Sequence, residues 1–476
     1  MVKNDFDAVV LGSGPNGLAA AITLQQKGLS VLLIEGRREI GGGLRSGELT
    51  LPGYTHDICS AIHPLAIASP FFSSLPLGKH GLDWITPAVA AAHPFNDGLA
   101  ATLVASVDTV ARDLGKDQQV YRRLMDPLVR DWGYLAPELL GPLRIPAHPL
   151  ALARFGLKGL PSVTVLAHRF RTREARGLLA GMAAHSMQPL TSLATAAVAL
   201  VFLMAGHGKG WPLPRGGASA LAGALAGYFE ALGGRIQTDT YISDLSQLPS
   251  SRALLLDLSP RQLLQLGGHR WSGLYQRQLE RYRYGPGVFK VDWALADRIP
   301  FLAPGCREAG TVHLGGSFEE IAASEAETVA GGHPERPFVL LAQQSLFDDS
   351  RAPEGRHTGW AYCHVPNGSR RDMTEAIERQ VERFAPGFRE RILARHTMDT
   401  AQMEEYNPNY IGGDINSGNL DILQLFTRPA LRSSPYRTSA RGIYLCSAST
   451  PPGGGVHGMC GYHAARRALK DIFGMR

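Results

Sequence analysis

Three glycines near the N-terminus have the spacing of a dinucleotide-binding turn. Gly12, Gly14 and Gly17 follow a short apolar run, Ala8 to Leu11, and lead into a helix-like stretch, Leu18 to Lys27. Gly12 permits the tight turn, Gly14 lets the backbone approach a pyrophosphate, and Gly17 lets the helix pack closely on the sheet. The N-terminus of this helix would direct its N–H groups and its positive dipole at the phosphates.

A carboxylate marks the end of the second strand that this region predicts. Ser30 to Ile34 has the composition of a buried strand, Gly28 suits the C-terminal cap of the preceding helix, and Glu35 ends the strand. At this point of the motif a carboxylate can accept hydrogen bonds from both hydroxyls of an adenosine ribose. The combination favours a dinucleotide site over an ordinary glycine turn, and it suits NAD or FAD.

Two further glycine-rich segments lie far apart in the chain. Gly36 to Ser46 is basic and glycine-rich, whereas an NAD dehydrogenase would continue here with another helix. The alternative interpretation of this segment is a flexible surface loop that binds no cofactor. Near the C-terminus a strand-like run, Gly442 to Thr450, leads through the turn Pro451 to Gly458 into a helix-like run, Met459 to Phe473. Small residues let a flat ring lie against the backbone, and the helix dipole would stabilise negative charge on it. A proline-rich turn is the alternative.

These motifs resemble those of the flavin amine oxidase and phytoene desaturase superfamily. Gly36 to Ser46 resembles the R-x-G-G-R segment of this superfamily. Arg38 stands in the place of the first arginine of that segment, and Arg45 lies two positions later than its second arginine usually does. Pro451 to Gly458 is similar to its C-terminal flavin motif, although Ser447 replaces the usual glycine or aspartate.

Inner segments extend the resemblance over nearly the whole chain. In the superfamily a glycine-containing turn, a helix and a strand bring the chain back to the flavin domain. The matching segments here are Trp211 to Gly217, a predicted helix over 218–232 and a predicted strand from Arg235 to about Leu245. Arg283 to Lys290 and Asn407 to Asp414 resemble the branch that includes the pyridine nucleotide-disulphide oxidoreductase-domain proteins. Carotenoid ketolases of the desaturase type are neighbours of that branch.

The resemblance implies FAD as the cofactor, bound noncovalently, and no metal. The cofactor-binding residues that the motifs and the resemblance predict are Gly12, Gly14, Pro15, Asn16, Gly17, Glu35, Gly36, Arg38, Gly42, Gly43, Leu44, Arg45, Ile242, Ser447, Gly455, Val456 and His457.

Catalytic residues are harder to assign, because hydride transfer from a C–H bond to a flavin demands no general base. Three histidines are candidates: His457 inside the flavin motif, His56 after the glycine-rich segment, and His364 after a predicted strand over 360–363. Further polar candidates are Asp57, Asn407, Asp414, His185 and Gln188. For each of these side chains a structural hydrogen bond is the alternative.

The expected fold is α/β, with a doubly wound, Rossmann-like FAD-binding domain assembled from three chain segments and an inserted α+β substrate domain. The FAD-binding domain is expected to comprise residues 1–75, 206–270 and 431–476, and the substrate domain residues 76–205 and 271–430. Repeated leucine and alanine predict a helical region over roughly residues 76–205, with breaks at Pro142, Pro146, Pro149 and Pro161. Other expected elements are strands over 253–258, 287–294 and 338–343 and a helix over 374–384.

Composition limits the class of protein. The formal charge of +6 comes from 48 basic and 42 acidic residues that are scattered along the chain, which argues against a nucleic-acid partner. The 5 cysteines form no C-x-x-C pair, which indicates a reducing compartment. The polar N-terminus shows no basic region followed by a cleavable apolar segment. A cytoplasmic protein is expected.

The longest charge-free apolar run, Leu190 to Ala205, is shorter than the roughly 20 residues of a spanning helix. It is predicted to form one buried helix, either in the core, as a tunnel wall or facing a membrane, so peripheral membrane contact is an open expectation.

The resemblance implies desaturation or oxidation of a hydrophobic polyene or isoprenoid-like substrate, with quinone, oxygen or NAD(P) as electron acceptor. A flavin-free prenyl-protein or lipid-binding protein on the same fold, a carotenoid ketolase and an amine oxidase are the alternatives.

Overall fold

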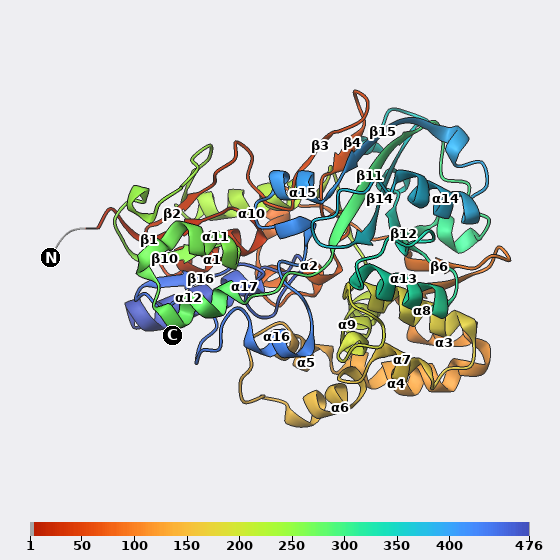
Figure 1. Ribbon diagram of the computed structural model, residues 1–476, viewed down its shortest axis with the longest axis horizontal. Helices are drawn as coiled ribbons and strands as arrows, with labels where there is room; N and C mark the ends of the chain where they lie inside the picture. The colour runs from red at the N-terminus through yellow and green to blue at the C-terminus, as the bar shows by residue number, and fades with distance from the viewer. Residues whose placement is uncertain (1–3, 476) are drawn as a thin grey trace.

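Two β-sheets organise the chain, whose computed structural model describes residues 4–475 (Figure 1). The first sheet has 5 strands in the order β16-β10-β1-β2-β9, and all of its pairings are parallel. Its strands are β1 (Phe6–Leu11), β2 (Val31–Ile34), β9 (Arg235–Gln237), β10 (Ser251–Leu256) and β16 (Ile443–Leu445). The chain therefore leaves this sheet after β2 and after β10 and returns to it twice.

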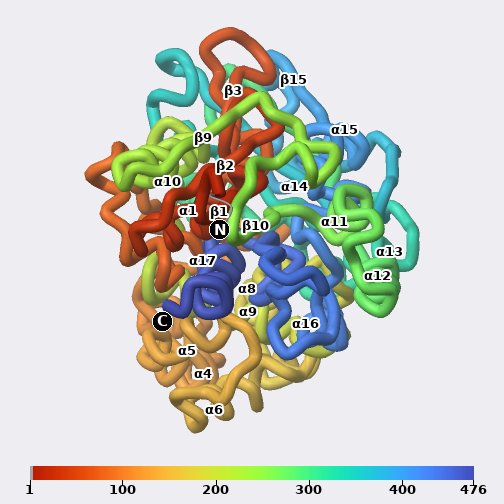
Figure 2. The backbone as a smooth tube through the Cα atoms, turned by 90° about the vertical axis from the view of Figure 1, so that its left-hand side faces the viewer, coloured from red at the N-terminus to blue at the C-terminus, as the bar shows by residue number. Residues whose placement is uncertain are grey.

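Helices cover both faces of the first sheet, which explains why its central strands are buried on both sides. On one face lie α1 (Pro15–Gln25), α10 (Ala218–Ala231) and α17 (Met459–Ala468). On the other lie α11 (Pro260–Gly267) and α12 (Gly273–Glu280). Figure 2 shows the two groups on either side of β1 and β10. This is the doubly wound arrangement that the sequence predicted.

The second sheet has 7 strands in the order β15-β11-β14-β13-β12-β6-β7, and it combines both insertions. The pairing of β12 with β6 is parallel, whereas the other pairings are antiparallel. Its strands are β6 (Val89–Pro94), β7 (Ala100–Val104), β11 (Gly287–Leu295), β12 (Ala309–Leu314), β13 (Val339–Ala342), β14 (His357–Val365) and β15 (Ile392–Met398). Two short pairs, β3 (Ser46–Glu48) with β4 (Thr55–Asp57) and β5 (Trp84–Ile85) with β8 (Leu213–Pro214), lie beside the sheets.

Helices also flank the second sheet. The helix α14 (Thr374–Phe384) packs on one face, while α8 (Arg173–Ala184) and α9 (Thr195–Gly208) belong to the core cluster that includes β6 and β7. The other α-helices are α2 (Pro64–Ala68), α3 (Val107–Asp113), α4 (Gln118–Arg130), α5 (Trp132–Leu139), α6 (Pro149–Gly159), α7 (Val163–Ala167), α13 (Phe318–Val329), α15 (Thr400–Tyr406) and α16 (Ile422–Thr427). The predicted α/β fold class with an inserted α+β unit is confirmed.

Two element predictions were wrong. Residues 76–205 are not helical throughout, because β5, β6 and β7 lie within them and β6 gains a parallel partner from the second insertion. The strand expected to run from Arg235 to about Leu245 ends at Gln237, where the chain turns through Asp239 at a φ of 53°. Both errors reflect pairings and turns that a local pattern does not reveal.

The apolar run Leu190 to Ala205 is also not one helix. The helix α9 begins at Thr195 and continues to Gly208, and Ala194 before it has a φ of 66°. The Thr195 hydroxyl donates to the Ser192 carbonyl at 2.8 Å and accepts from the Val163 N–H at 2.9 Å, which fixes a turn ahead of the helix. Among residues 4–475, no helix combines the length and the apolar character that crossing a membrane requires.

The crossing of α1 and α17 gives a test of the fold. A Cβ at Gly461 would lie 1.8 Å from the backbone oxygen of Asn16, so Gly461→Ala should force the helices apart and destabilise the protein by about 1–3 kcal/mol in thermal unfolding. Gly223→Ala on the exposed side of α10 is the control, because its Cβ meets nothing within 4 Å and alanine favours a helix by about 0.5–1 kcal/mol. Equal melting temperatures for the two variants would contradict the close crossing.

Candidate functional site

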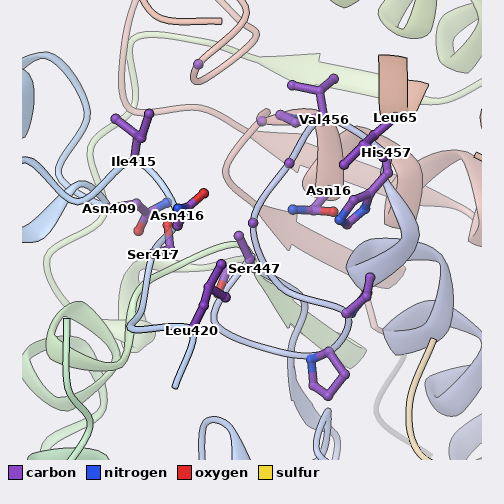
Figure 3. A pocket seen from close by; sticks show the side chains of 18 of the residues that line it. Asn16, Leu65, Asn409, Ile415, Asn416, Ser417, Leu420, Ser447, Val456 and His457 are labelled. Carbon is purple, nitrogen blue, oxygen red and sulfur yellow. The ribbon is translucent and has the colours of Figure 1, made fainter. Parts of the chain in front are cut away.

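A cavity of about 1970 Å³ lies between the two sheets and is lined from both. Its wall includes the glycine turn after β1, the loop after β2, the turn before α17, and side chains of α6, α9 and β14. Ligand sites usually measure about 300–1000 Å³, so this cavity has room for a dinucleotide and a second molecule. Figure 3 shows part of it from close by.

One end of the cavity is formed by the N-terminus of α1. Gly12, Ser13, Gly14, Pro15 and Asn16 all line the cavity, and the N-cap residue Gly14 has no side chain that could cap the helix. The buried Asn16 Oδ1 has no hydrogen-bond partner among the described residues. A helix N-terminus that its N-cap residue leaves open, with an unsatisfied amide oxygen beside it, fits the phosphates and polar groups of a dinucleotide.

Glu35 lies on the cavity wall next to this turn. Its Oε2 accepts hydrogen bonds from the Ser13 N–H at 3.0 Å and the Ser13 hydroxyl at 2.6 Å. Its Oε1 accepts from the Arg37 N–H at 3.0 Å, with the Arg45 guanidinium 3.5 Å away. The carboxylate is therefore fixed in one orientation at the end of β2, where the motif predicted an adenosine contact.

The predicted cofactor residues nearly all line this cavity, and the exceptions are Gly17 and Arg38. Gly17 lies beneath the turn, where a Cβ would be 1.9 Å from the Gly12 oxygen, so it serves the close packing of helix on strand. Arg38 is exposed, and its neighbour Arg37 lines the cavity instead, because the loop turns directly after Glu35. Arg45 lines the cavity although it lies two positions beyond the place of the second arginine in the motif. Its Cζ is 5.5 Å from the centre of the Tyr406 ring.

Asp257 is a cavity residue that sequence reasoning missed. It follows β10, and its Oδ2 accepts the Gly17 N–H at 3.0 Å directly beneath the glycine turn. Burial raises the pKa of Asp257 to about 7; the Glu35 charge adds to the rise and the Gly17 hydrogen bond opposes it. The signal was present, since Asp257 ends a predicted strand as Glu35 does, and parallel strands bring their carboxyl ends to one edge.

The turn before α17 lies directly beside the N-terminus of α1 on the cavity wall. Figure 3 shows His457 beside Asn16, with Asn409, Ile415, Asn416 and Ser417 on the opposite side. The residues of the C-terminal segment that line the cavity are Ser447, Ala448, Pro451, Pro452, Gly454, Gly455, Val456 and His457. The two glycine-rich motifs, distant in sequence, thus meet at one site.

Of the three histidine candidates, only His457 lines the cavity. Its Nδ1 accepts the Met459 N–H at 3.1 Å, which leaves the ring proton of the neutral form on Nε2. Burial lowers the pKa of His457 to about 4, although the Gly453 and Gly454 carbonyls oppose the shift. At neutral pH the His457 ring is therefore uncharged and stabilises the turn through its hydrogen bond to Met459. Such a low pKa does not suit a general base.

The other two histidines lie outside the cavity wall. His364 is inside β14 rather than after a strand, and its Nδ1 is 2.9 Å from both carboxylate oxygens of Glu325. His56, on β4, bonds through Nε2 to the Thr50 hydroxyl at 2.8 Å, and burial lowers its pKa to about 4. Both rings are buried among protein groups, so the structure does not bring them to the dinucleotide end.

Several other polar candidates have structural partners. Asp57 accepts the Ala218 N–H at the start of α10 and pairs with Arg351 at 2.9 Å. Asp414 accepts three backbone N–H groups in the 285–418 region. Asn407 and His185 do line the cavity, whereas Gln188 does not.

The part of the cavity away from Glu35 is mainly apolar. Its lining from α6, α9 and β13 includes Leu152, Phe155, Val198, Val201, Phe202 and Leu340. Lys290, Trp360 and Tyr362 of the second sheet also face it, and the Lys290 ammonium pairs with Asp292. Sequence reasoning missed these three because their strands follow a long insertion and only the folded sheet brings them to the site.

A guanidinium also reaches the cavity. Arg428 is fully buried, donates to the Tyr282 hydroxyl and the Ala448 carbonyl at 2.9 Å each, and its Nη1 has no partner among the described residues. Its Nη1 lies beside Gly453, where a Cβ would be 2.9 Å away. Arg428 therefore stabilises the turn before α17 through its hydrogen bond to the Ala448 carbonyl and its contact with Gly453.

Comparisons with known proteins agree with this geometry. A family model described as an NAD(P)-binding Rossmann-like domain matches residues 10–72. The mouse pyridine nucleotide-disulfide oxidoreductase domain-containing protein 2 is 26% identical, over 100% of this chain and 95% of its own. Phytoene desaturase (lycopene-forming) of a Paracoccus species is 24% identical over 95% of each chain. A limonene dehydrogenase polypeptide of Castellaniella defragrans is 23% identical over 98% of this chain and 95% of its own.

A solved structure shows the same fold over the whole chain. Putrescine oxidase bound to putrescine superposes with a TM-score of 0.62 at 17% identity, covering 98% of this chain and 99% of that chain. The protein is thus an oxidoreductase whose Rossmann-like domain takes a flavin or nicotinamide dinucleotide. The chain is similar over nearly its whole length to a phytoene desaturase and shares its fold with putrescine oxidase, which agrees with the superfamily that its motifs resemble.

The raised pKa of Asp257 predicts how stability depends on pH. Between about pH 4 and 7 the folded protein keeps a proton that the unfolded chain has lost, so stability falls as pH rises through this window. Asp257→Asn stays neutral and can still accept the Gly17 N–H. The variant should match the parent at about pH 4 and exceed it by a melting temperature on the order of 5 °C at pH 8. Exposed Asp349→Asn is the control, and a pH-independent difference for Asp257→Asn would contradict the assignment.

Proposed function

We propose that this protein is an FAD-dependent oxidoreductase, a desaturase or oxidase that takes hydride from a hydrophobic, polyene or isoprenoid-like substrate. The observation that carries the proposal is the continuity of the cavity. One space runs from the glycine turn and Glu35, past the turn before α17, to the apolar walls of α6 and α9. A dinucleotide and an apolar molecule can therefore meet without crossing bulk water.

The residues present fit FAD. The N-terminus of α1 would hold the pyrophosphate and Glu35 the ribose, and Ile242, which lines the cavity, would contact the adenine. The backbone between Gly454 and His457 would support the ring system. When bound, FAD accepts a hydride from a substrate C–H bond. The chain's part is to bind and orient both molecules and to keep water out.

The bonding of the carboxylates along the cavity argues against a cationic substrate. The carboxylates on its wall are Glu35, Glu138 and Asp257, which bond to Ser13, Arg144 and Gly17 respectively. Among the described lining residues, none offers a free carboxylate to an ammonium group in the apolar part. This favours a polyene or isoprenoid over an amine, and two relatives are named for phytoene and limonene.

The alternatives differ in measurable ways. A flavin-free lipid-binding protein would use only the apolar part of the cavity. That alternative does not explain the open helix N-terminus and the oriented Glu35 at the other end. A carotenoid ketolase would share the cofactor and substrate class but insert oxygen. Quinone, oxygen and NAD(P) are the acceptors to compare, by following reoxidation of the reduced protein with each.

The first test concerns the cofactor. The purified protein should be yellow with noncovalent FAD, and Glu35→Ala should raise the FAD dissociation constant about tenfold or more, because hydrogen bonds to a carboxylate contribute about 1.5–3 kcal/mol. Exposed Glu39→Ala, on the same loop, should leave that constant unchanged. A colourless protein that takes up no added FAD would refute the proposed function. Equal FAD titrations for Glu35→Ala and Glu39→Ala would refute only the role of Glu35.

The second test concerns the apolar part of the cavity. Val201 is half-buried and lines the cavity, whereas its neighbour Leu200 is fully buried in the core of the helical layer. Val201→Asp should keep its melting temperature and FAD content but raise KM for a polyene about tenfold. Leu200→Asp should unfold the protein, because a charge in a packed core has no partner. If both variants unfold alike, Val201 is core and does not belong to the substrate site.

A further inference from the structure

One histidine interrupts the apolar part of the cavity. His185 follows directly after α8, is half-buried and lines the cavity. Its ring centre lies 4.5 Å from that of Phe202 and 6.5 Å from that of Trp211, and both of these rings also line the cavity. A polar side chain among apolar neighbours lowers stability unless its hydrogen bonds are made. The partners of the two ring nitrogens therefore indicate what His185 does.

A second histidine fixes the orientation of His185. The Nε2 of His185 lies 3.1 Å from the Nε2 of His313, which is fully buried on β12. Gly181 of α8 leaves room for the His313 ring, because a Cβ there would lie 2.6 Å from the His313 Nδ1. The contact engages one nitrogen of His185, and the Nδ1 has no partner among residues 4–475. This second nitrogen is available to a molecule in the cavity.

Both imidazoles are uncharged at neutral pH. Burial lowers the pKa of His185 to about 3, and the nearby His364 adds to the shift. Burial also lowers the pKa of His313 well below its ordinary value. One Nε2 therefore donates to the other, and the Nδ1 of His185 is an acceptor in one tautomer and a donor in the other. A hydroxyl group complements either tautomer, because it can both donate and accept.

A threonine hydroxyl lies in the same part of the cavity. Thr311 precedes His313 by two residues on β12, so both side chains lie on one face of the sheet, and Thr311 lines the cavity. Its Oγ1 accepts the Trp211 Nε1–H at 2.9 Å, while its own proton has no acceptor among the described residues. Buried polar groups in proteins nearly always find partners. Two neighbouring groups with hydrogen-bonding capacity left over therefore point to a ligand.

We propose that His185 and Thr311 bind a hydroxyl group of the substrate, so that the protein acts on an isoprenoid alcohol rather than on a hydrocarbon. This inference rests on the proposed function and names its substrate class. The substrate oxygen would accept the Thr311 proton and form a hydrogen bond with the His185 Nδ1, and its apolar chain would lie along α6 and α9. A hydrocarbon would leave both groups without a partner, which is how sites built for a hydroxyl reject analogues that lack it. His185 is thus a specificity-determining residue and takes no part in the C–H chemistry.

Ligand binding without turnover tests the proposal. Farnesol and the hydrocarbon with hydrogen in place of its hydroxyl form a matched pair of probes. The tryptophan fluorescence of the purified full chain reports binding, because Trp211 contacts both His185 and Thr311. The parent protein should bind farnesol about tenfold or more tightly than the hydrocarbon.

Two substitutions separate the roles of the two ring nitrogens. His185→Gln places an amide near the position of Nε2, so the bond to His313 and the melting temperature should be kept, while farnesol affinity should fall about tenfold to that of the hydrocarbon. His185→Asn places an amide near the position of Nδ1, so the preference for farnesol should remain although the melting temperature falls. A purely structural role for His185 predicts the opposite pattern.

His168→Gln is the matched control, because His168 is exposed after α7 and does not line the cavity. It should change neither affinity. Equal affinities of the parent for the two probes would overturn the proposal and indicate that water satisfies the two groups. A preference for farnesol that His185→Gln leaves intact would overturn it as well. The FAD content of the same preparation is measured separately, and its absence would refute the proposed function whichever probe binds more tightly.

Discussion

The site depends on parallel strands that bring their carboxyl ends to one edge of the first sheet. Gly12 follows β1, Glu35 follows β2, Asp257 follows β10 and Ser447 follows β16, although hundreds of residues separate the first from the last. The central strands β1 and β2 contain few polar residues and are largely buried, so helices must cover both faces, and the helix N-termini then face the same edge. Hydrogen bonding and burial in the sheet thus decide where cofactor chemistry can take place.

The second sheet supplies what the first lacks. Its parallel pairing of β12 with β6 joins the two insertions, so that α6 and α9 from one and β11 and β14 from the other enclose a common space. The wall contributed by helices is apolar, whereas the sheet adds Lys290 in its ion pair with Asp292. The end of the cavity beside the glycine turn therefore continues into a region lined mainly by apolar side chains.

Local patterns predicted the parts of the site that are local. The glycine turn, Glu35 and the turn through His457 each depend on a few neighbouring residues, and their motifs were visible in the sequence. His56 and His364 do not line the cavity, and the sequence could not show this because a polar residue near a motif carries no information on the direction of its side chain. The alanine-rich segment Val89–Pro94 has a helical composition, and its pairing with β12, which is distant in sequence, makes it a strand. The apolar helix begins only at Thr195 because that residue forms a turn with Val163, which is also distant in sequence.

The position of β16 in the sheet has a consequence for biosynthesis. Translation proceeds from the N-terminus, so the glycine turn and Glu35 leave the ribosome long before β16 and α17, which complete both the sheet and the cavity. During that interval the edge of β10 has no partner strand, and long-range pairing of this kind forms slowly. Capture of a dinucleotide is therefore a late event, and the nascent chain is most exposed to aggregation just before its last strand is added.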